Sequence, residues 1–408
     1  MLFDPSRHEA LRAVAWDEGR VRAAIAHIAA DAEARYVPEF GWPAHPRDIE
    51  PGDDPSQPFT PLYHGTAGVI WALHYLQSLG AVRLARVYAD DLEALRLRNR
   101  ARLEAAGSEH ECASYLMGDT PILMLAQGLA PTPKPERADA LAALIAGNID
   151  HPARELMWGA PGTLLAALFL HERDAGDARW GDLFRATAAR LWSQLEWSDR
   201  HACHYWTQDL YGQRSNYIDA VHGFVATALP LIRGRSLLAD ADWAAWQHCI
   251  VNTVERTATH EDGMANWRPW LETFEGKKTP MLMQYCHGAP GFVVCLAGMP
   301  GTALDELLLA AGEAVWAAGP LTKGSNLCHG TGGNGYAFLK LYQRSGDALW
   351  LERARAFAMH GLEQMESDEA QHGQLRHSLW TGDPGFAIYL WDCLRGKAAF
   401  PTLDVFWG

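Results

Sequence analysis

Two kinds of helical segment alternate along this chain. One kind is apolar on nearly every face, as in 69–73 (Val-Ile-Trp-Ala-Leu) and 164–170 (Leu-Leu-Ala-Ala-Leu-Phe-Leu), a pattern typical of buried helices. The other kind carries its charges on one face, as in 91–98 (Asp-Leu-Glu-Ala-Leu-Arg-Leu-Arg), which suits an outer layer in contact with solvent. Alternating runs of β-branched residues are scarce, so the pattern predicts few or no core strands.

A glycine-containing turn precedes each apolar segment. Repeats of this length are typical of stacked supersecondary units rather than of separate domains. Two of the turns, at Gly118 and Gly223, keep only the first glycine of the pattern, so the repeat is degenerate. The seven turns, 41 to 65 residues apart, lie at Gly65, Gly118, Gly159, Gly223, Gly288, Gly330 and Gly382.

The amphipathic segments complete the repeat, because one lies before each turn. Seven outer–inner helix pairs closed into a ring predict an all-α fold, an α/α toroid or double-layer helical barrel, as a single domain of residues 1–408. We expect the outer helices at about Ala15–Tyr36, Leu84–Ala105, Pro135–Ile149, Asp182–Glu196, Asp240–Ala258, Ala303–Ala318 and Ala348–Met365.

Inner helices in such a ring run parallel, so their N-terminal turns gather at one end, which we call the mouth. The free N–H groups and the positive dipole ends of these helices favour anions there. Three long connections, 47–61, 197–216 and 260–280, are predicted to be loops over the ring.

Composition narrows the class of protein. With 48% hydrophobic and 21% charged residues, the chain has ample material for a core. Its net charge of -14 argues against nucleic-acid binding and against docking on anionic membranes. No apolar run is long enough for a transmembrane segment, and the first residues lack the pattern of a signal peptide. Seven scattered cysteines, an odd number, indicate reduced thiols, so we expect a cytoplasmic protein.

Two turns carry the candidate chemistry, Cys286-His287-Gly288 and Cys328-His329-Gly330. Cysteine thiolate and neutral imidazole are the ligands that Zn²⁺ prefers, and three of them leave one tetrahedral position open. The pairs lie 42 residues apart, so only the global fold can join them. We predict one zinc per chain, held by Cys286, Cys328 and His329. His287 is the weaker candidate, since adjacent residues often point to different sides, and buried structural cysteines are the alternative.

The type of ligand favours one use of such a metal. Two thiolate ligands make zinc electron-rich and less able to acidify water, which favours holding a substrate thiol as its thiolate.

Two further residues lie beside the predicted mouth. His222 directly precedes the fourth turn glycine and could transfer protons, since histidine titrates near neutrality. A structural histidine is the alternative. Glu155, four residues before the third turn glycine, could be a carboxylate partner, with an outer-face salt bridge as the alternative.

Lys323 lies five residues before Cys328 in a glycine-flanked loop and could meet an anionic ligand. A solvated surface lysine is the alternative. His64 also precedes a glycine turn, but its neighbours Leu62 and Tyr63 indicate no catalytic role.

These motifs resemble those of the lanthionine synthetase C family, most closely its LanC-like (LanCL) branch. The resemblance extends through all seven turns. Its most specific part is 323–330 (Lys-Gly-Ser-Asn-Leu-Cys-His-Gly), followed by 285–291 (Tyr-Cys-His-Gly-Ala-Pro-Gly), 220–223 (Ala-Val-His-Gly) and 378–382 (Ser-Leu-Trp-Thr-Gly).

The resemblance implies an α/α toroid with one zinc on Cys286, Cys328 and His329. It implies that a thiol adds to a dehydroalanine or dehydrobutyrine residue and forms a thioether. In the peptide cyclases that thiol is a cysteine of the same peptide, and in the LanC-like branch it is glutathione. The resemblance further implies that His222 transfers a proton, that position 155 is acidic, and that Lys323 is associated with glutathione binding.

One departure bears on the choice between these branches. The peptide cyclases carry an arginine shortly before the first zinc cysteine, whereas residues 280–284 here are Pro-Met-Leu-Met-Gln, which favours the LanC-like branch. The expected partners are therefore glutathione or another thiol, together with peptides or proteins that contain dehydroamino acids. Three alternatives stay open: a lanthionine cyclase acting on its precursor peptide, a non-catalytic glutathione- or peptide-binding protein, and a toroidal glycoside hydrolase with two carboxylates across the ring.

Overall fold

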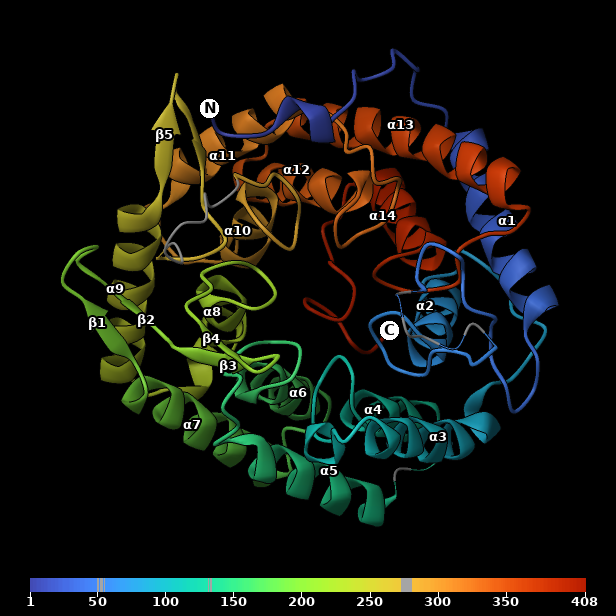
Figure 1. Ribbon diagram of the computed structural model, residues 1–408, viewed down its shortest axis with the longest axis horizontal. Helices are drawn as coiled ribbons and strands as arrows, with labels where there is room; N and C mark the ends of the chain where they lie inside the picture. The colour runs from blue at the N-terminus through green and yellow to red at the C-terminus, as the bar shows by residue number, and fades with distance from the viewer. Residues whose placement is uncertain (50, 52–53, 55, 131, 133, 273–280) are drawn as a thin grey trace.

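The computed structural model describes residues 1–49, 51, 54, 56–130, 132, 134–272 and 281–408. In this part of the chain, fourteen α-helices form two concentric rings (Figure 1), which confirms the predicted α/α toroid. The inner ring consists of α2 (Thr66–Ser78), α4 (Thr120–Leu129), α6 (Ala160–Arg173), α8 (Phe224–Arg233), α10 (Ala289–Leu296), α12 (Thr331–Ser345) and α14 (Asp383–Arg395). The outer ring consists of α1 (Glu18–Arg35), α3 (Leu92–Ala105), α5 (Pro135–Asn148), α7 (Ala178–Ser193), α9 (Asp240–Thr257), α11 (Asp305–Ala318) and α13 (Ala348–His372).

Three outer helices differ from their predicted bounds by four residues or more at one end. Helix α3 begins at Leu92, because Glu33 accepts bonds from the backbone N–H groups of Ala85 and Arg86 and holds that stretch extended. Helix α7 begins four residues early, where Asp177 caps it. Helix α13 runs on to His372, because its last turns pair with α1 through contacts such as His27 Nε2 to Glu369 at 2.9 Å.

The inner helices are buried along most of their length, as their apolar sequences predict. All eight residues of α10 are buried, as are residues 160–170 of α6. The second glycine of the repeat permits tight packing at the helix start. A Cβ atom at Gly291 or Gly333 would collide with a backbone carbonyl of the preceding turn.

Backbone hydrogen bonds link one glycine turn to another around the mouth. The N–H of Cys286 donates to the carbonyl of Cys328, so the two cysteine-bearing turns lie side by side. The ring closes where Trp380 of the last turn donates to Tyr63 of the first. The series comprises Tyr63 to Leu116 (3.1 Å), Leu116 to Met157 (3.3 Å), Leu156 to Val221 (3.1 Å), Cys286 to Cys328 (3.0 Å), Cys328 to Trp380 (2.8 Å) and Trp380 to Tyr63 (3.0 Å).

The described strands form three small antiparallel hairpins rather than a core sheet. They lie mainly in two of the three connections predicted as loops, 197–216 and 260–280. Of the three predicted loops, residues 50, 52, 53, 55 and 273–280 lie outside the described part of the chain. The hairpins are β1 (Glu196–Ser198) with β2 (Cys203–Tyr205), β3 (Gln208–Leu210) with β4 (Gln213–Ser215), and β5 (Thr259–Glu261) with β6 (Met264–Asn266).

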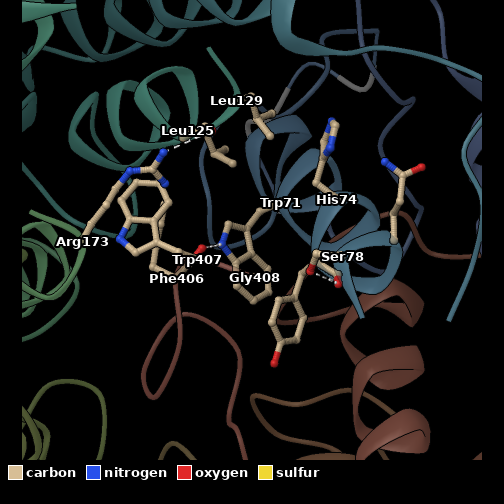
Figure 2. A pocket seen from close by; sticks show the side chains of 12 residues that line it. Trp71, His74, Ser78, Leu125, Leu129, Arg173, Phe406, Trp407 and Gly408 are labelled. Atoms are coloured by element: carbon tan, nitrogen blue, oxygen red, sulfur yellow. Dashed lines mark hydrogen bonds between the residues drawn. The ribbon is translucent and has the colours of Figure 1, made fainter. Parts of the chain in front are cut away.

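The segment after α14 turns into the middle of the ring (Figure 1). Its Phe400 stacks on Tyr285 with ring centroids 4.5 Å apart, and Trp71 Nε1 donates to the carbonyl of Phe406 at 2.9 Å. Trp71 and Phe406, with Trp407, line a cavity of about 210 Å³ beside the C-terminal halves of α2 and α4 (Figure 2). The segment thus fills the middle of the ring and contacts residues of the glycine turns.

No helix among the described residues is both long enough and apolar enough to cross a membrane. That residues 1–408 form a single domain stays a prediction.

Candidate metal and proton-transfer site

The structure brings together the three residues predicted as metal ligands. One ligand atom each from Cys286, Cys328 and His329 lies within 4.8 Å of the other two. The cysteines are only 8% and 3% exposed, respectively. This donor set of two thiols and one imidazole, at the end of a hydrogen-bonded pair of turns, fits a soft divalent cation such as Zn²⁺.

Each sulfur also accepts a hydrogen bond from a neighbouring side chain. The hydroxyl of Tyr63 donates to Cys328 Sγ at 2.9 Å, and Gln284 Nε2 donates to Cys286 Sγ at 2.9 Å. Arg7 in turn donates to Gln284 Oε1 at 3.0 Å. Tyr63 of the first turn thus contacts a predicted metal ligand, a role that the sequence did not indicate. Such outer partners orient metal ligands and tune their charge.

The pKa shifts of Cys328 and His329 favour the forms that bind a metal, whereas that of Cys286 favours the protonated thiol. Burial raises the pKa of the Cys286 thiol, whereas hydrogen bonds from Cys286 and from the Tyr63 hydroxyl lower the pKa of Cys328. Burial lowers the pKa of His329 to about 4, so this imidazole is neutral at pH 7, the form that binds a metal.

Beside the metal ligands lies a histidine–carboxylate pair. His222 Nδ1 is 2.8 Å from Glu155 Oε2, and the carboxylate also accepts the backbone N–H groups of Met157 and Trp158 at 2.9 and 2.6 Å. Glu155 is wholly buried, so it does not form the outer-face salt bridge of the alternative interpretation. Burial alone would lower the pKa of His222, but the hydrogen bond and charge of Glu155 raise it above the ordinary 6.5.

A second such pair joins two neighbouring turns. His287 Nδ1 lies 2.6 Å from Asp219 Oδ2, and Asp219 Oδ1 accepts the backbone N–H groups of Val221 and His222 at 3.0 and 2.8 Å. The rings of His222 and His287 are 6.5 Å apart. One nitrogen of His287 is thus engaged by Asp219, and His287 is not part of the three-residue ligand set.

Sequence reasoning missed Asp219, although a signal was present. Asp219 stands four residues before its turn glycine, as Glu155 does before its own. Asn326 has the same spacing, and its side chain accepts the backbone N–H of His329 at 3.0 Å. In these three turns the polar residue at this position caps the turn, and in the two where it is acidic it also holds an imidazole.

His222 and His329 face one cavity of about 540 Å³ at the mouth. The charged residues of the cavity come from the last repeat, from the segment before the first turn and, for Arg102, from α3. Among them, Arg376 forms an ion pair with Asp48, with Nε 2.8 Å from Oδ2. The full lining is Arg47, Asp48, Phe59, Tyr63, His64, Arg102, Met117, Met157, Trp158, Tyr211, His222, His329, Arg376 and Thr381.

Lys323 does not line this cavity. Its side chain is exposed beside a smaller polar pocket that also includes Arg47 and Arg376. The carbonyl of Lys323 accepts a bond from Arg47 Nη2 at 2.9 Å. Its ammonium makes no hydrogen bond or ion pair that links it to another residue described by the structure.

Fold and site together define an α/α toroid with a candidate cysteine–histidine metal centre at its mouth. The sequence profile described as "Lanthionine synthetase C-like protein" matches residues 58–405. The chain therefore belongs to the lanthionine synthetase C-like family.

Two named relatives align over part of their length. LanC-like protein GCL1 of Arabidopsis thaliana is 38% identical over 128 residues, which cover 29% of this chain and 28% of the relative. Glutathione S-transferase LANCL1 of Danio rerio is 34% identical over 141 residues, 32% of this chain and 33% of the relative. The alignments thus span a third or less of these relatives.

The solved structure of nisin cyclase is similar in fold, with a TM-score of 0.57 over 83% of this chain and 89% of that chain. At 14% sequence identity this similarity shows the fold alone.

Proposed function

We propose that this protein adds a thiol, glutathione, to dehydroalanine or dehydrobutyrine residues of a peptide or protein, with Zn²⁺ held by Cys286, Cys328 and His329. The observation that carries the proposal is the common cavity, into which His329 of the ligand set and His222 of the Glu155 pair both open. A relative named as a glutathione S-transferase supports the choice of thiol. A reducing, cytoplasmic setting belongs to the same proposal.

The reaction joins two substrates without an oxidant or reductant. The thiol first loses its proton to solvent, and its sulfur then forms a bond to Cβ of the dehydro residue. The π electron pair moves onto Cα and the adjoining carbonyl, and Cα then takes up a proton. Bound zinc would supply the means of keeping the thiol ionised at neutral pH.

His222 is placed to deliver that proton. Glu155 holds its Nδ1, which leaves Nε2 for the substrate, and the raised pKa of His222 keeps a protonated fraction near neutral pH. Glu155 is itself fixed by two backbone N–H groups, so the imidazole is held in one orientation.

The charged part of the mouth suits the thiol substrate. Glutathione is a net anion at neutral pH, because it carries two carboxylates and one amine. In a protein of net charge -14 it needs local positive charge. Around the smaller pocket Arg47 pairs with Asp368 and Arg376 with Asp48, so the exposed Lys323 is the cation proposed to meet glutathione.

The geometry disfavours a glycoside hydrolase. Of the described cavity lining, Asp48 is the carboxylate, and Arg376 neutralises it. Glu155 and Asp219 are wholly buried and engaged by imidazoles, so neither matches a carboxylate facing a sugar across the ring.

A dehydroalanine peptide and glutathione, supplied to matched variants, test the proposal. We expect about one zinc per chain in the wild type, its loss in Cys328→Ala, and its retention in His222→Asn. The rate should fall on the order of 10²–10⁴ in His222→Asn, the usual contribution of a positioned proton donor. Cys249→Ala, at a buried cysteine of α9, is the control and should keep both zinc and activity.

Two outcomes would count against the proposal. A wild-type rate in His222→Asn would remove the assigned proton donor. Ring closure by a cysteine of the peptide itself, with no glutathione incorporated, would identify a lanthionine cyclase instead.

A further inference from the structure

One part of the mouth cavity is apolar and has no role in the proposed chemistry. Phe59, Met117, Met157, Trp158 and Tyr211 line it. The first four belong to the first three glycine turns, and Tyr211 belongs to the hairpin of β3 and β4. We call these five residues the apolar wall. Most of the charged lining, Arg47, Asp48 and Arg376, lies at the last repeat or is bound to it. Arg102 of α3 differs, because its guanidinium lies over the Phe59 ring, 4.7 Å from the ring centroid.

Tyr211 is the most exposed member of this wall. It is 69% exposed, an unusual amount for an aromatic side chain held by the fold. Trp158 Nε1 donates to the Tyr211 hydroxyl at 3.1 Å, and that hydroxyl lies 3.7 Å from Met157 Sδ. The Tyr211 ring thus keeps an apolar face open to solvent, while its hydroxyl is held by Trp158 and Met157.

The backbone at Tyr211 is strained. Tyr211 and Gly212 form the two-residue turn between β3 and β4, with φ of 54° and 70°. Such turns favour asparagine followed by glycine, and a bulky aromatic residue at positive φ is an outlier. The hairpin is held at its base, where Asp209 N–H donates to the Pro152 carbonyl at 3.0 Å. Strain of this kind persists only where surrounding contacts fix it.

The wall adjoins the proton donor. The Tyr211 ring lies 6.1 Å from the His222 ring in an edge-to-face arrangement. In Figure 1 the hairpin lies between α6 and α8 and extends toward the middle of the ring. A dehydro residue within reach of His222 would therefore place a neighbouring side chain of its peptide against Tyr211.

We propose that Tyr211, Met157 and Trp158 form a subsite for an apolar side chain adjacent to the dehydro residue of the acceptor peptide. The inference rests on the proposed function, because that function identifies the residue beside this side chain as a dehydro residue. The occupant is an aliphatic or aromatic side chain, because an exposed aromatic face and a thioether gain by excluding water. An acidic neighbour would be disfavoured by the protein's charge of -14, because Tyr211, Met157 and Trp158 themselves carry no positive charge.

Binding of unreactive peptides tests the subsite without depending on catalysis. The peptides carry alanine in place of dehydroalanine, followed by Leu, Phe, Ser or Asp, and are titrated into the full chain by calorimetry. We expect Leu and Phe peptides to bind about tenfold more tightly than Ser and Asp peptides. Burial of one apolar side chain supplies enough binding free energy for a difference of this size. Tyr211→Ala should abolish the difference, and Tyr211→Phe should keep most of it.

The control is Trp197→Ala, which removes an aromatic side chain that is 51% exposed on β1, outside the cavity lining. It should leave the preference unchanged. Equal binding of all four peptides by the wild type, or no measurable binding, would overturn the inference. So would an unaltered preference in Tyr211→Ala, or a raised glutathione KM in that variant, because the wall would then serve the thiol.

A small acceptor separates this inference from the proposed function. In Tyr211→Ala, glutathione addition should slow more for a peptide with Leu beside the dehydroalanine than for N-acetyldehydroalanine amide, and the zinc should be retained. If the wild type adds no thiol to any acceptor, the proposed function fails, while the peptide titrations still decide whether the subsite exists.

Discussion

Replacing Glu155 by glutamine tests how the proton donor is held. The carboxylate accepts three hydrogen bonds, from the backbone of Met157 and Trp158 and from His222 Nδ1. Glutamine keeps one acceptor oxygen and adds an NH₂ group, so at least one of these donors would face another donor. An unsatisfied buried polar group costs about 1–3 kcal/mol, and we expect the free energy of unfolding to fall by that amount.

The loss of charge should act on the pH dependence of the reaction. Glu155 raises the pKa of His222 against the opposing effect of burial, so without its charge the pKa should fall. Since the protonated imidazole is the donor, the rate falls as pH rises through this pKa. Each unit by which the pKa drops lowers the protonated fraction at slightly alkaline pH about tenfold, equivalent to about 1.4 kcal/mol. The alkaline limb should therefore move to lower pH.

The assay is the pH profile of kcat/KM for glutathione addition in four proteins: wild type, Glu155→Gln, His222→Asn and the double variant. If Glu155 acts through His222, adding Glu155→Gln to His222→Asn should change the rate little further. An alkaline limb that stays in place, or independent losses that multiply in the double variant, would refute this reasoning. Zinc content should be equal in all four proteins.

Three further substitutions test the metal ligands, the smaller polar pocket and the fold. Tyr63→Phe removes the hydroxyl that donates to Cys328 and should weaken zinc binding about tenfold or more, measured by competition with a chelator. An unchanged zinc affinity would contradict the assigned contact. Lys323→Ala should raise the glutathione KM about tenfold while sparing a small neutral thiol, since a charge-assisted bond supplies roughly 1.5–3 kcal/mol; equal effects on both thiols would count against it. Gly333→Ala forces a Cβ into the backbone of the preceding turn and should destabilise the fold by about 1–3 kcal/mol or more in thermal unfolding, whereas Gly298→Ala, which meets only ordinary contacts, should not.

The sequence carried enough information for the ring but not for its closure. Apolar segments after glycine turns predict buried parallel helices, and the two Cys-His-Gly motifs predict which turns bear metal ligands. The contact of Tyr63 with Cys328 joins residues 265 positions apart, and it depends on the last turn binding the first. No local pattern encodes that closure.

The hairpins were missed for a different physical reason. Strands of three residues are too short to show an alternating pattern, and the turn at Tyr211 and Gly212 lacks the asparagine that usually marks such a hairpin. Asp219 was overlooked because its role appears only when two repeats are aligned with each other. It stands at the same distance before its turn glycine as Glu155 does, and both carboxylates bind an imidazole.

The measurement that tests the central claim most directly is mass spectrometry of a dehydroalanine peptide incubated with glutathione and three preparations of the wild-type protein. These are the zinc-containing protein, the protein after chelation, and the chelated protein after one equivalent of zinc is returned. We predict that the peptide gains the mass of one glutathione with the first and third preparations and not with the second. Equal product from the chelated protein, shown by elemental analysis to be free of metal, or no glutathione adduct from any preparation, would contradict the account.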